Sequence, residues 1–269
     1  MSYLLNRTGW CLFSSMVLIS CHKPAAKPDN NVPALIPFPG GNILQITMHQ
    51  PSQTKDTAFF ENGLIAEIKG ENVSAKFKLG GNWLQQKDEY SKTNILFRRT
   101  YYGEFYGKMS WESINDYPNL TSGTNGSKEY GWNLDSLTQI LYFNTDRSTR
   151  NYTWKIDFSY DADGNIKCAR QYDTTTTLIC TYNFTYNRDS ASPFRAIFAY
   201  NFDFYFVDTS PLNDAIKAAL LFSNNRLTKV TAASPGFTPL NFDYIDNKRL
   251  CRSILINNQP AYSFKYASD

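Results

Sequence analysis

Apolar and polar residues alternate with a period of two in many short segments after residue 41, and this pattern constrains the fold more than any other feature of the sequence. Leu64, Ala66 and Ile68 are predicted to share one face of a strand, and the segment 73–79 repeats the pattern. Gly, Pro, Asn and Asp cluster between such segments, as they do in turns between strands. Tyr and Phe, with 18 and 19 residues, suit half-buried strand surfaces. The chain is therefore predicted to be mainly β.

Tight turns between these segments favour an antiparallel sheet in which consecutive strands pair. Three stretches share an aromatic-rich strand, a turn with Asp or Asn, and an Ile or Leu that opens the next strand. They are FSYDADGNIK, LLFSNNRLTKV and FDYIDNKRLCR. Their irregular separation indicates a meander rather than a solenoid. We expect an antiparallel meander sheet, with a curved or half-barrel form as one arrangement, and one short helix over 211–222, where Pro211 suits the first turn.

Residues 112–136 are predicted to be a long irregular loop, because Pro118 and several Gly and Asn-Gly signals interrupt the alternation. This loop leaves two domain arrangements open. The β domain over 42–269 is either undivided or made of two halves, 42–135 and 136–269.

The N-terminal residues differ from the rest of the chain. Arg7 is the only charged residue among residues 1–20, and the uncharged apolar run that follows it has about half the length of a spanning helix, which fits a signal peptide. The tetrapeptide LISC resembles a bacterial lipobox, and this resemblance implies cleavage before Cys21 and acylation of Cys21. An ordinary secretory signal with a chance cysteine is the alternative.

Residues 21–41 contain five prolines and are predicted to be an extended tether between the membrane and the β domain. Two or more acyl chains on Cys21 would hold the protein stably on a membrane. We therefore expect the cell envelope as its location, lipid-anchored to the outer membrane on its periplasmic or surface side.

Two cysteines raise the question of a disulfide. Cys168 and Cys180 lie symmetrically about Thr174, so a hairpin that turns there would set them opposite each other. An exported protein permits a disulfide. Burial of both thiols as small apolar side chains is the alternative of equal weight.

The stretch YDADGNIKC raises the question of a calcium loop, because Asp161, Asp163 and Asn165 alternate around Gly164. If Gly164 occupies the sixth position of an EF-hand loop, the twelfth falls on Arg170, where that geometry needs a bidentate Glu. A calcium turn of another kind is the remaining metal-binding alternative. The favoured interpretation is a hairpin in which Asp163 and Gly164 take positive φ in a two-residue primed turn.

Composition and motifs exclude several functions. With 27 basic and 24 acidic residues and no run of five Lys or Arg, the chain lacks the charge pattern of a nucleic-acid binder. Its two histidines, His22 and His49, give no set for zinc or for a Ser-His-Asp site, and no cofactor motif occurs. The protein is predicted not to be an enzyme, with a carboxylate-based glycoside hydrolase as the remaining alternative. The available carboxylates are Glu104, Glu112, Asp157 and Asp243.

Aromatic residues just before the predicted loop and near its C-terminal end are the candidates for ligand binding. Exposed aromatic rings stack on sugars or anchor a protein partner, whereas cross-strand packing inside the sheet is the alternative. The candidates are Tyr101, Tyr102, Tyr106, Trp111, Tyr130 and Trp132.

Cys21 and the YDADGNI stretch, with the similar stretches that follow it, resemble those of exported lipoproteins of Bacteroidetes-type bacteria, a family of unknown function with YD-like repeats. The resemblance covers residues 155–266. It implies a largely antiparallel β fold, in some members a half-barrel or porin-like form, and it supplies no catalytic residues. The expected role is binding or structural, with a glycan or protein as partner. A lipid- or lipoprotein-handling carrier with an apolar cavity is the alternative.

Overall fold

The computed structural model describes most of the chain after residue 42, within the compact unit Phe38–Asp269. The described residues are 43–50, 54–61, 64–80, 84–105, 108–116, 126–144, 152–194, 212–247 and 250–267. Cys21, the predicted signal peptide and the predicted tether lie outside them, as do Tyr106 and Pro211.

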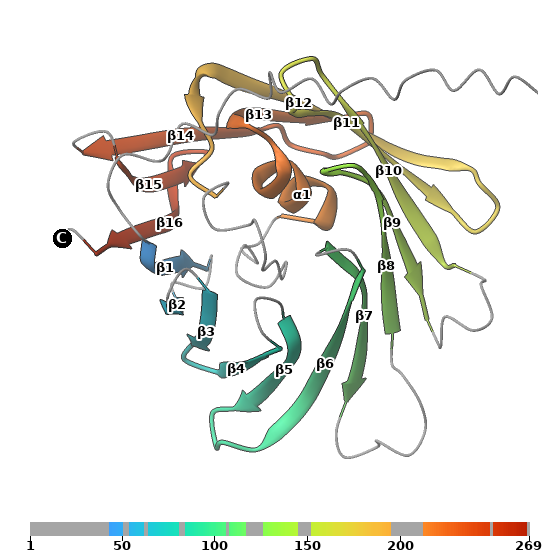
Figure 1. The fold of residues 1–269 in the computed structure, drawn as a ribbon. Coiled ribbons are helices and arrows are strands. Elements are labelled where there is room, and N and C mark those ends of the chain that lie inside the picture. Colours follow the sequence, from blue (N-terminus) through green and yellow to red (C-terminus); the bar gives the residue numbers. More distant parts are fainter. Residues whose placement is uncertain are drawn as a thin grey trace, which may run out of the picture. The chain divides into compact units, whose positions relative to one another are not determined.

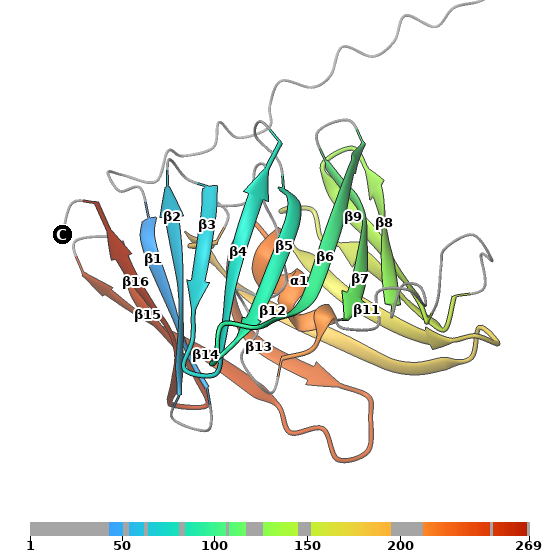
Figure 2. The ribbon, with the colours of Figure 1, turned by 90° about the horizontal axis from the view of Figure 1, so that it is seen from below.

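Sixteen antiparallel strands form one closed barrel in which each strand pairs with its neighbours in sequence (Figures 1 and 2). The strands are β1 (Ile43–His49), β2 (Lys55–Glu61), β3 (Leu64–Lys69), β4 (Val73–Leu79), β5 (Leu84–Ser91), β6 (Leu96–Phe105), β7 (Lys108–Asp116), β8 (Gly126–Asn133), β9 (Ser136–Phe143), β10 (Trp154–Tyr160), β11 (Ile166–Asp173), β12 (Leu178–Ala191), β13 (Asn225–Ala232), β14 (Leu240–Asn247), β15 (Leu250–Ile256) and β16 (Gln259–Tyr266). The predicted antiparallel meander is confirmed. The sheet is closed rather than a half-barrel, because β16 pairs with β1 and sets Phe264 opposite Ile46.

Most of residues 112–136 is strand, so the predicted loop is wrong. Only residues 117–125 between β7 and β8 lie outside the described part. Inward-facing side chains at every second position, such as Tyr130 and Trp132, outweigh the turn-forming residues of this stretch. β8 and β9 form a hairpin around residues 134–135, so the sheet is continuous between the two suggested halves.

Most side chains that face the inside of the barrel are apolar and many polar side chains face outward, although Lys87, Glu89, Glu112 and Lys128 face inward. On β4, Ala75 and Phe77 point inward, whereas Lys76 and Lys78 are exposed on the outer face. The strand register carries this alternation around the ring, with outward positions that include Ser74, Lys76, Lys78, Gln86, Asp88, Lys155, Asp157, Arg170, Asn183, Thr185, Lys229, Thr231, Asn241, Asp243, Ser263 and Lys265. The ring thus buries a largely apolar core that includes a few charged side chains, and it carries many charged, amide and hydroxyl groups on its outer wall.

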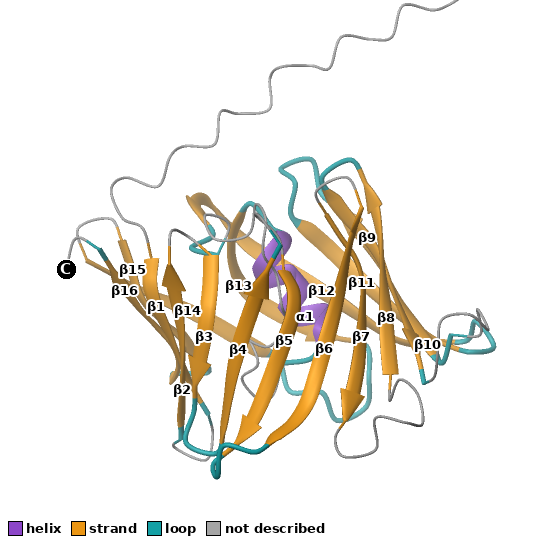
Figure 3. Ribbon diagram, turned by 60° about the horizontal axis from the view of Figure 1, so that its bottom comes forward, coloured by secondary structure: helices purple, strands orange, loops and turns teal. Residues whose placement is uncertain are grey.

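The helix α1 (Asp214–Phe222) lies inside the ring of strands, as the views in Figures 1 to 3 agree. All residues from Ala215 to Leu221 are buried, and the helix packs against β11, β12 and β13. Asn213 caps it, with its side-chain oxygen accepting the N–H of Ile216 at 3.1 Å, so the helix begins at Asp214 rather than at residue 211. Among the described residues, no helix has the length and apolar character needed to cross a membrane.

A β-bulge at Ala66 changes which residues of β3 face the core. The register between β2 and β3 shifts there, which interrupts the strict alternation. Ile65 and Ile68 are buried at 0% and 1% exposure, whereas Ala66 is only half-buried. The prediction that Ala66 shares a face with Ile68 is therefore wrong.

Three hairpins end in the same three-residue turn. The turns begin at Ser91, Asp161 and Asp173. In each, the first residue accepts the backbone N–H three residues later and donates its own N–H to the carbonyl oxygen four residues later. Its side-chain oxygen accepts a further backbone N–H. The fourth residue takes a positive φ, which is 59° at Asn94, 78° at Gly164 and 65° at Thr176.

Aromatic side chains join the two strands of five consecutive hairpins at one rim of the barrel. Each lies near the end of an even-numbered strand and donates a hydrogen bond to a backbone carbonyl oxygen near the start of the preceding strand. The pairs are Trp132 to Met109 (2.7 Å), Tyr160 to Leu137 (3.0 Å), Tyr186 to Ile166 (2.8 Å), Tyr244 to Leu227 (3.0 Å) and Tyr266 to Cys251 (2.8 Å). We call these contacts aromatic latches and this edge of the barrel the latch rim. β1 begins and β16 ends at the same rim.

Two of the three similar sequence stretches contribute a latch tyrosine, Tyr160 in FSYDADGNIK and Tyr244 in FDYIDNKRLCR. The third stretch, LLFSNNRLTKV, is not a hairpin, and its predicted role is wrong. It contains the end of α1 and the start of β13, because the buried apolar residues that precede Ser223 belong to the helix.

Candidate functional site

The predicted binding aromatics fall into two groups on opposite faces of the barrel wall. The inward group is Tyr102, Tyr130 and Trp132. The outward group is Tyr101, which is 39% exposed, and Trp111, which lies against Gly103. Trp132 also contacts Phe222 of α1 edge to face, with ring centroids 5.6 Å apart. The described members therefore do not form one binding surface, and core packing accounts for the inward group.

Asp161 holds the YDADGNIKC turn together. Its carboxylate accepts the N–H of Asp163 at 3.0 Å, the N–H of Asn165 at 2.9 Å and the side-chain amide of Asn165 at 3.2 Å. Gly164 has the predicted positive φ, but Asp163 does not, because the loop contains three residues, 162–164, rather than two. These bonds form an Asx-turn, in which the protein's own N–H groups occupy the carboxylate. The described residues contain no group of three His, Cys, Asp or Glu suited to a metal.

Further hydrogen bonds join this turn to the link between α1 and β13. The buried side chain of Asn165 accepts the N–H of Asn225 at 2.8 Å and donates to the side-chain oxygen of Asn225 at 3.0 Å. Asn224 donates its side-chain N–H to the carbonyl oxygen of Asp163 at 2.6 Å. Two of the similar sequence stretches thus meet in space, and their asparagines hold the point where the helix passes into the barrel wall.

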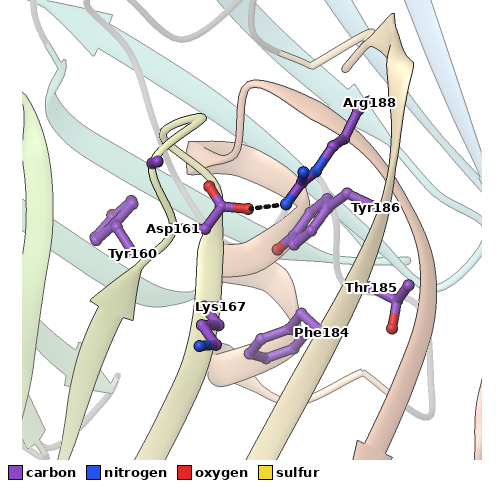
Figure 4. A pocket seen from close by; sticks show the side chains of 8 residues that line it. Tyr160, Asp161, Lys167, Phe184, Thr185, Tyr186 and Arg188 are labelled. Carbon is purple, nitrogen blue, oxygen red and sulfur yellow. Dashed lines mark ion pairs between the residues drawn. The ribbon is translucent and has the colours of Figure 1, made fainter.

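A pocket of about 520 Å³ lies beside this turn, between β11 and β12 (Figure 4). The two strands pair from Cys168 and Asn183 towards their shared turn, and nearer the latch rim β12 pairs only with β13. The pocket fills the wedge between the separating strands. We call it the wedge pocket, and its lining residues include Tyr160, Asp161, Lys167, Phe184, Tyr186 and Arg188. Its volume falls within the range typical of small-molecule sites.

Three aromatic rings line the wedge pocket. The hydroxyl groups of Tyr160 and Tyr186 are committed to latch bonds, so these residues offer mainly their rings. Burial raises the pKa of both hydroxyls well above the ordinary value, which keeps them neutral. Phe184, at 7% exposure, supplies the third ring. Aromatic faces of this kind stack on the flat or C–H-rich faces of ligands.

Charged side chains also line the wedge pocket. Nε of Arg188 lies 2.9 Å from an oxygen of Asp163, and its Nη2 lies 4.0 Å from an oxygen of Asp161 (Figure 4). Lys167 is exposed, and within the described part of the chain it forms no ion pair. The pocket therefore carries one positive charge that no described carboxylate neutralises.

A second polar site, the interior charge cluster, joins α1 to the inner wall formed by β7, β8 and β9. Nζ of Lys128 lies 2.9 Å from Glu112 and 3.0 Å from Asp214. The hydroxyl of Tyr142 donates to Asp214, and Nζ of Lys217 lies 3.7 Å from the same carboxylate. Two cations and two anions thus balance around the first turn of α1.

The environment of this cluster moves its pKa values away from neutrality. Burial lowers the pKa of Lys128, but the two nearby carboxylates outweigh burial and hold the pKa above its ordinary value. Burial raises the pKa of Asp214, but Lys128 and Lys217 hold it below its ordinary value. Burial raises the pKa of Tyr142. These groups keep one protonation state near pH 7, whereas general acid–base catalysis needs a group that titrates near the working pH.

Sequence reasoning missed the interior charge cluster because Glu112 and Lys128 lie in the predicted loop. The available signal was the alternation Lys128, Tyr130, Trp132, which places all three side chains on one face of a strand. Asp214 was also hidden, because its strand partners Tyr142 and Lys128 lie 72 and 86 residues earlier in the sequence.

The four carboxylates of the hydrolase alternative lie apart. Glu112 faces the barrel interior, whereas Asp157 is on the outer face, 2.8 Å from Nζ of Lys155. Asp243 and Glu104 are exposed on β14 and β6. The four therefore occupy four strands and both faces of the wall.

Cys168 and Cys180 are buried free thiols. The register of β11 and β12 sets Cys168 opposite Asn183 and Cys180 opposite Gln171. The two cysteines are offset because the turn centres on Thr175 and a bulge follows Gln171. The geometric argument for a disulfide between them therefore fails, and both thiols pack as small apolar side chains.

Comparison with known proteins adds a likeness of fold. No protein-family model matches the chain, and no curated protein matches it. A porin-like protein from Bacteroides uniformis is similar in structure, with a TM-score of 0.50, 13% identity, and coverage of 83% of this chain and 97% of that chain. The two chains share a fold. A porin-like protein from Bacteroides vulgatus has a TM-score of 0.48 and 10% identity, with 84% and 98% of the chains covered.

Proposed function

We propose that this protein is a lipid-anchored component of the bacterial cell envelope, with a water-facing barrel that binds a ligand rather than catalysing a reaction. The observation that carries the proposal is the polar outer wall. A membrane-spanning barrel needs an outward apolar band about 25 Å tall, with its polar side chains in the lumen. Lys76, Asp88 and Arg170 occupy outward positions here, and most of the side chains that face inward are apolar.

Membrane attachment then falls to the N-terminus. A Lys or Arg on the lipid face costs about 2–4 kcal/mol at the bilayer midplane, so a wall with many such residues favours water. The lipobox-like LISC stretch supports acyl chains on Cys21 as the attachment, with residues 21–41 as tether. The fold shared with a porin-like protein of Bacteroides supports a bacterial envelope setting.

Two observations support binding rather than catalysis. The wedge pocket has the volume of a small-ligand site and combines aromatic rings with an unneutralised lysine. The interior charge cluster holds the pKa of Lys128 above its ordinary value and that of Asp214 below its ordinary value, which suits the positioning of α1 better than proton transfer near neutral pH.

The anchor is tested by replacing Cys21. We expect Cys21→Ala to abolish incorporation of labelled palmitate and to leave the protein extractable from membranes by alkaline washing. Cys11→Ala, a substitution within the same N-terminal segment, is the matched control and should keep both the label and the membrane association. A Cys21→Ala protein that lacks the label but resists alkaline extraction would show that the barrel itself inserts, which contradicts the proposal.

A lipid- or lipoprotein-handling carrier is the second candidate. The apolar side chains of the inner wall of β1 to β4 are the surface that a carrier would use, and they include Ile46, Met48, Ala58, Ile68 and Ala75. Barrels of 16 or more strands enclose more space than a small barrel fills with its own side chains. Native mass spectrometry of the detergent-purified protein tests this role, since a carrier should retain lipid that denaturation releases.

A further inference from the structure

We propose that the wedge pocket binds an acidic sugar residue of a glycan, with Lys167 pairing with its carboxylate and the rings of Phe184 and Tyr186 contacting its apolar face. This inference rests on the proposed binding function. It places recognition at β10 to β12 rather than at the aromatics predicted from the sequence.

The chemistry of the lining selects a ligand with one flat C–H-rich face. Tyr160, Phe184 and Tyr186 come from two strands, and the latch bonds hold both tyrosine rings in fixed positions. Because the tyrosine hydroxyls are already used, the rings offer stacking surface. A pyranose ring presents such a C–H face together with hydroxyl groups on its edge.

The charge of the lining selects an anion. Asp161 is occupied by its own turn, and Arg188 is paired with Asp163 and Asp161. The guanidinium group of Arg188 thus lies near both carboxylates, whereas the ammonium group of Lys167 forms no ion pair with a described residue and is left to pair with a ligand. A carboxylate on the sugar ring meets this need through a charge-assisted hydrogen bond.

The wedge pocket is preorganised, because hydrogen bonds and ion pairs across the separating strands hold its walls in place. Tyr186 bridges to Ile166 at 2.8 Å, and Arg188 bridges to the turn that contains Asp163 at 2.9 Å. Lys167 and Phe184 extend from the two strands that border the pocket (Figure 4). A preorganised site loses little conformational entropy when a ligand binds.

The test is a titration of the detergent-purified full chain with methyl glucuronide, followed by isothermal calorimetry and by ligand-observed NMR. We expect the glucuronide to bind more tightly than methyl glucoside, which lacks the carboxylate. Lys167→Ala should weaken glucuronide binding about tenfold or more, the effect of losing one charge-assisted hydrogen bond. Because Lys167 is exposed, the variant keeps the fold, which circular dichroism checks.

Lys229→Ala is the matched control, since Lys229 is an exposed lysine on the neighbouring strand β13 and does not line the pocket. It should bind the glucuronide like the unchanged protein. Sodium acetate should not compete at equal ionic strength, because it lacks the ring. Equal affinity for glucuronide and glucoside, unchanged binding by Lys167→Ala, effective competition by acetate, or no binding at all would each overturn the proposal. The Cys21→Ala protein should bind equally well, so failure of the anchor and failure of this site are distinguishable.

Discussion

Tyr186 donates its hydroxyl hydrogen to the carbonyl oxygen of Ile166 at 2.8 Å, at the place where β11 and β12 cease to pair. The hydroxyl of Ser223 donates to Tyr186 at 2.8 Å and accepts the N–H of Ile166 at 3.0 Å. Three hydrogen bonds thus close a ring among two strands and the residue that follows α1. The ring compensates for missing ladder bonds between the strands and ties the helix to the wall.

Tyr186→Phe removes the hydroxyl group that forms this latch and keeps the aromatic ring of residue 186. We expect the free energy of unfolding to fall by about 1–3 kcal/mol, because the substitution leaves buried polar groups of Ile166 and Ser223 without their partner. Urea unfolding followed by circular dichroism measures the change. Tyr101→Phe is the control, since Tyr101 is 39% exposed on the outer face, and it should change stability by less than about 0.5 kcal/mol. Equal effects of both substitutions would contradict a structural role for the latch.

Alkaline pH should unfold the protein steeply. Burial raises the pKa of several tyrosines above the ordinary value, among them Tyr182, to about 12. The others are Tyr130, Tyr142, Tyr160, Tyr186, Tyr244 and Tyr266. Above about pH 10 the unfolded chain loses protons that the folded chain retains, so stability is complete below that pH and falls as pH rises.

Each such tyrosine contributes a loss of about 1.4 kcal/mol per pH unit in that range. The part of the tyrosinate absorbance that comes from these seven tyrosines should therefore appear together with the loss of the β-sheet signal in circular dichroism. Ionisation of all 18 tyrosines before any loss of β structure would contradict the buried state of these hydroxyls.

The hairpin turn at Thr176 carries backbone strain, because a β-branched residue there has φ of 65°. Thr176→Gly should raise the free energy of unfolding by about 1 kcal/mol, since glycine adopts this conformation without steric cost. At the same position of the turn at residues 161–165, Gly164→Ala should have the opposite sign. Its new Cβ would lie 2.4 Å from the side-chain nitrogen of Asn224. Thermal unfolding of both variants checks the two signs, and a destabilised Thr176→Gly protein would refute the strain.

Lys128→Met tests the interior charge cluster. It leaves the carboxylates of Glu112 and Asp214 buried without their main partner, and we expect a loss of about 3–5 kcal/mol in the free energy of unfolding. Adding Glu112→Gln should restore part of the loss, because it removes one uncompensated charge. Lys229→Met, at an exposed outward position, is the control and should be nearly neutral. A Lys128→Met protein as stable as the control would show that the cluster does not hold the helix.

The described cysteines should behave as three protected thiols. Burial raises the pKa of the Cys251 thiol to about 12, which keeps it un-ionised and slow to react. Cys168 and Cys180 are buried and out of register with each other. Mass spectrometry after alkylation without reductant should find little labelling in the folded protein and labelling of all three thiols in denaturant. Only one labelled thiol in denaturant would indicate the disulfide and contradict the register.

Many strands and hairpins could be predicted from local sequence patterns. Features that depend on pairing between residues distant in sequence could not. The period-two alternation located β4, and the turn residues located the hairpin at Gly164, because both depend on neighbouring residues alone. The bulge at Ala66 and the offset of Cys168 from Cys180 depend on the partner strand, so alternation alone placed them incorrectly.

The candidate site was less predictable than the fold. Lys167 and Phe184 lie on the adjacent strands β11 and β12. No local sequence pattern indicates that these two strands stop pairing and separate near these residues. The latch tyrosine Tyr160 was visible in the sequence as part of a recurrent turn, but its partner Leu137 lies 23 residues away on another strand. Contacts between residues on different strands follow from closure of the barrel, and no local sequence pattern specifies that closure.

The pairing of β1 with β16 has a consequence for how the protein is made. Ile43 of β1 pairs with Tyr266 of β16, so the first strand of the barrel cannot complete its pairing until the last strand is present. During synthesis every chain that still lacks β16 has two unpaired sheet edges, which are sites for aggregation and proteolysis. A chain truncated before β16 would keep nearly all of its sequence and still lack a closed form. Closure of this barrel therefore depends on β16, the last of its strands to be synthesised.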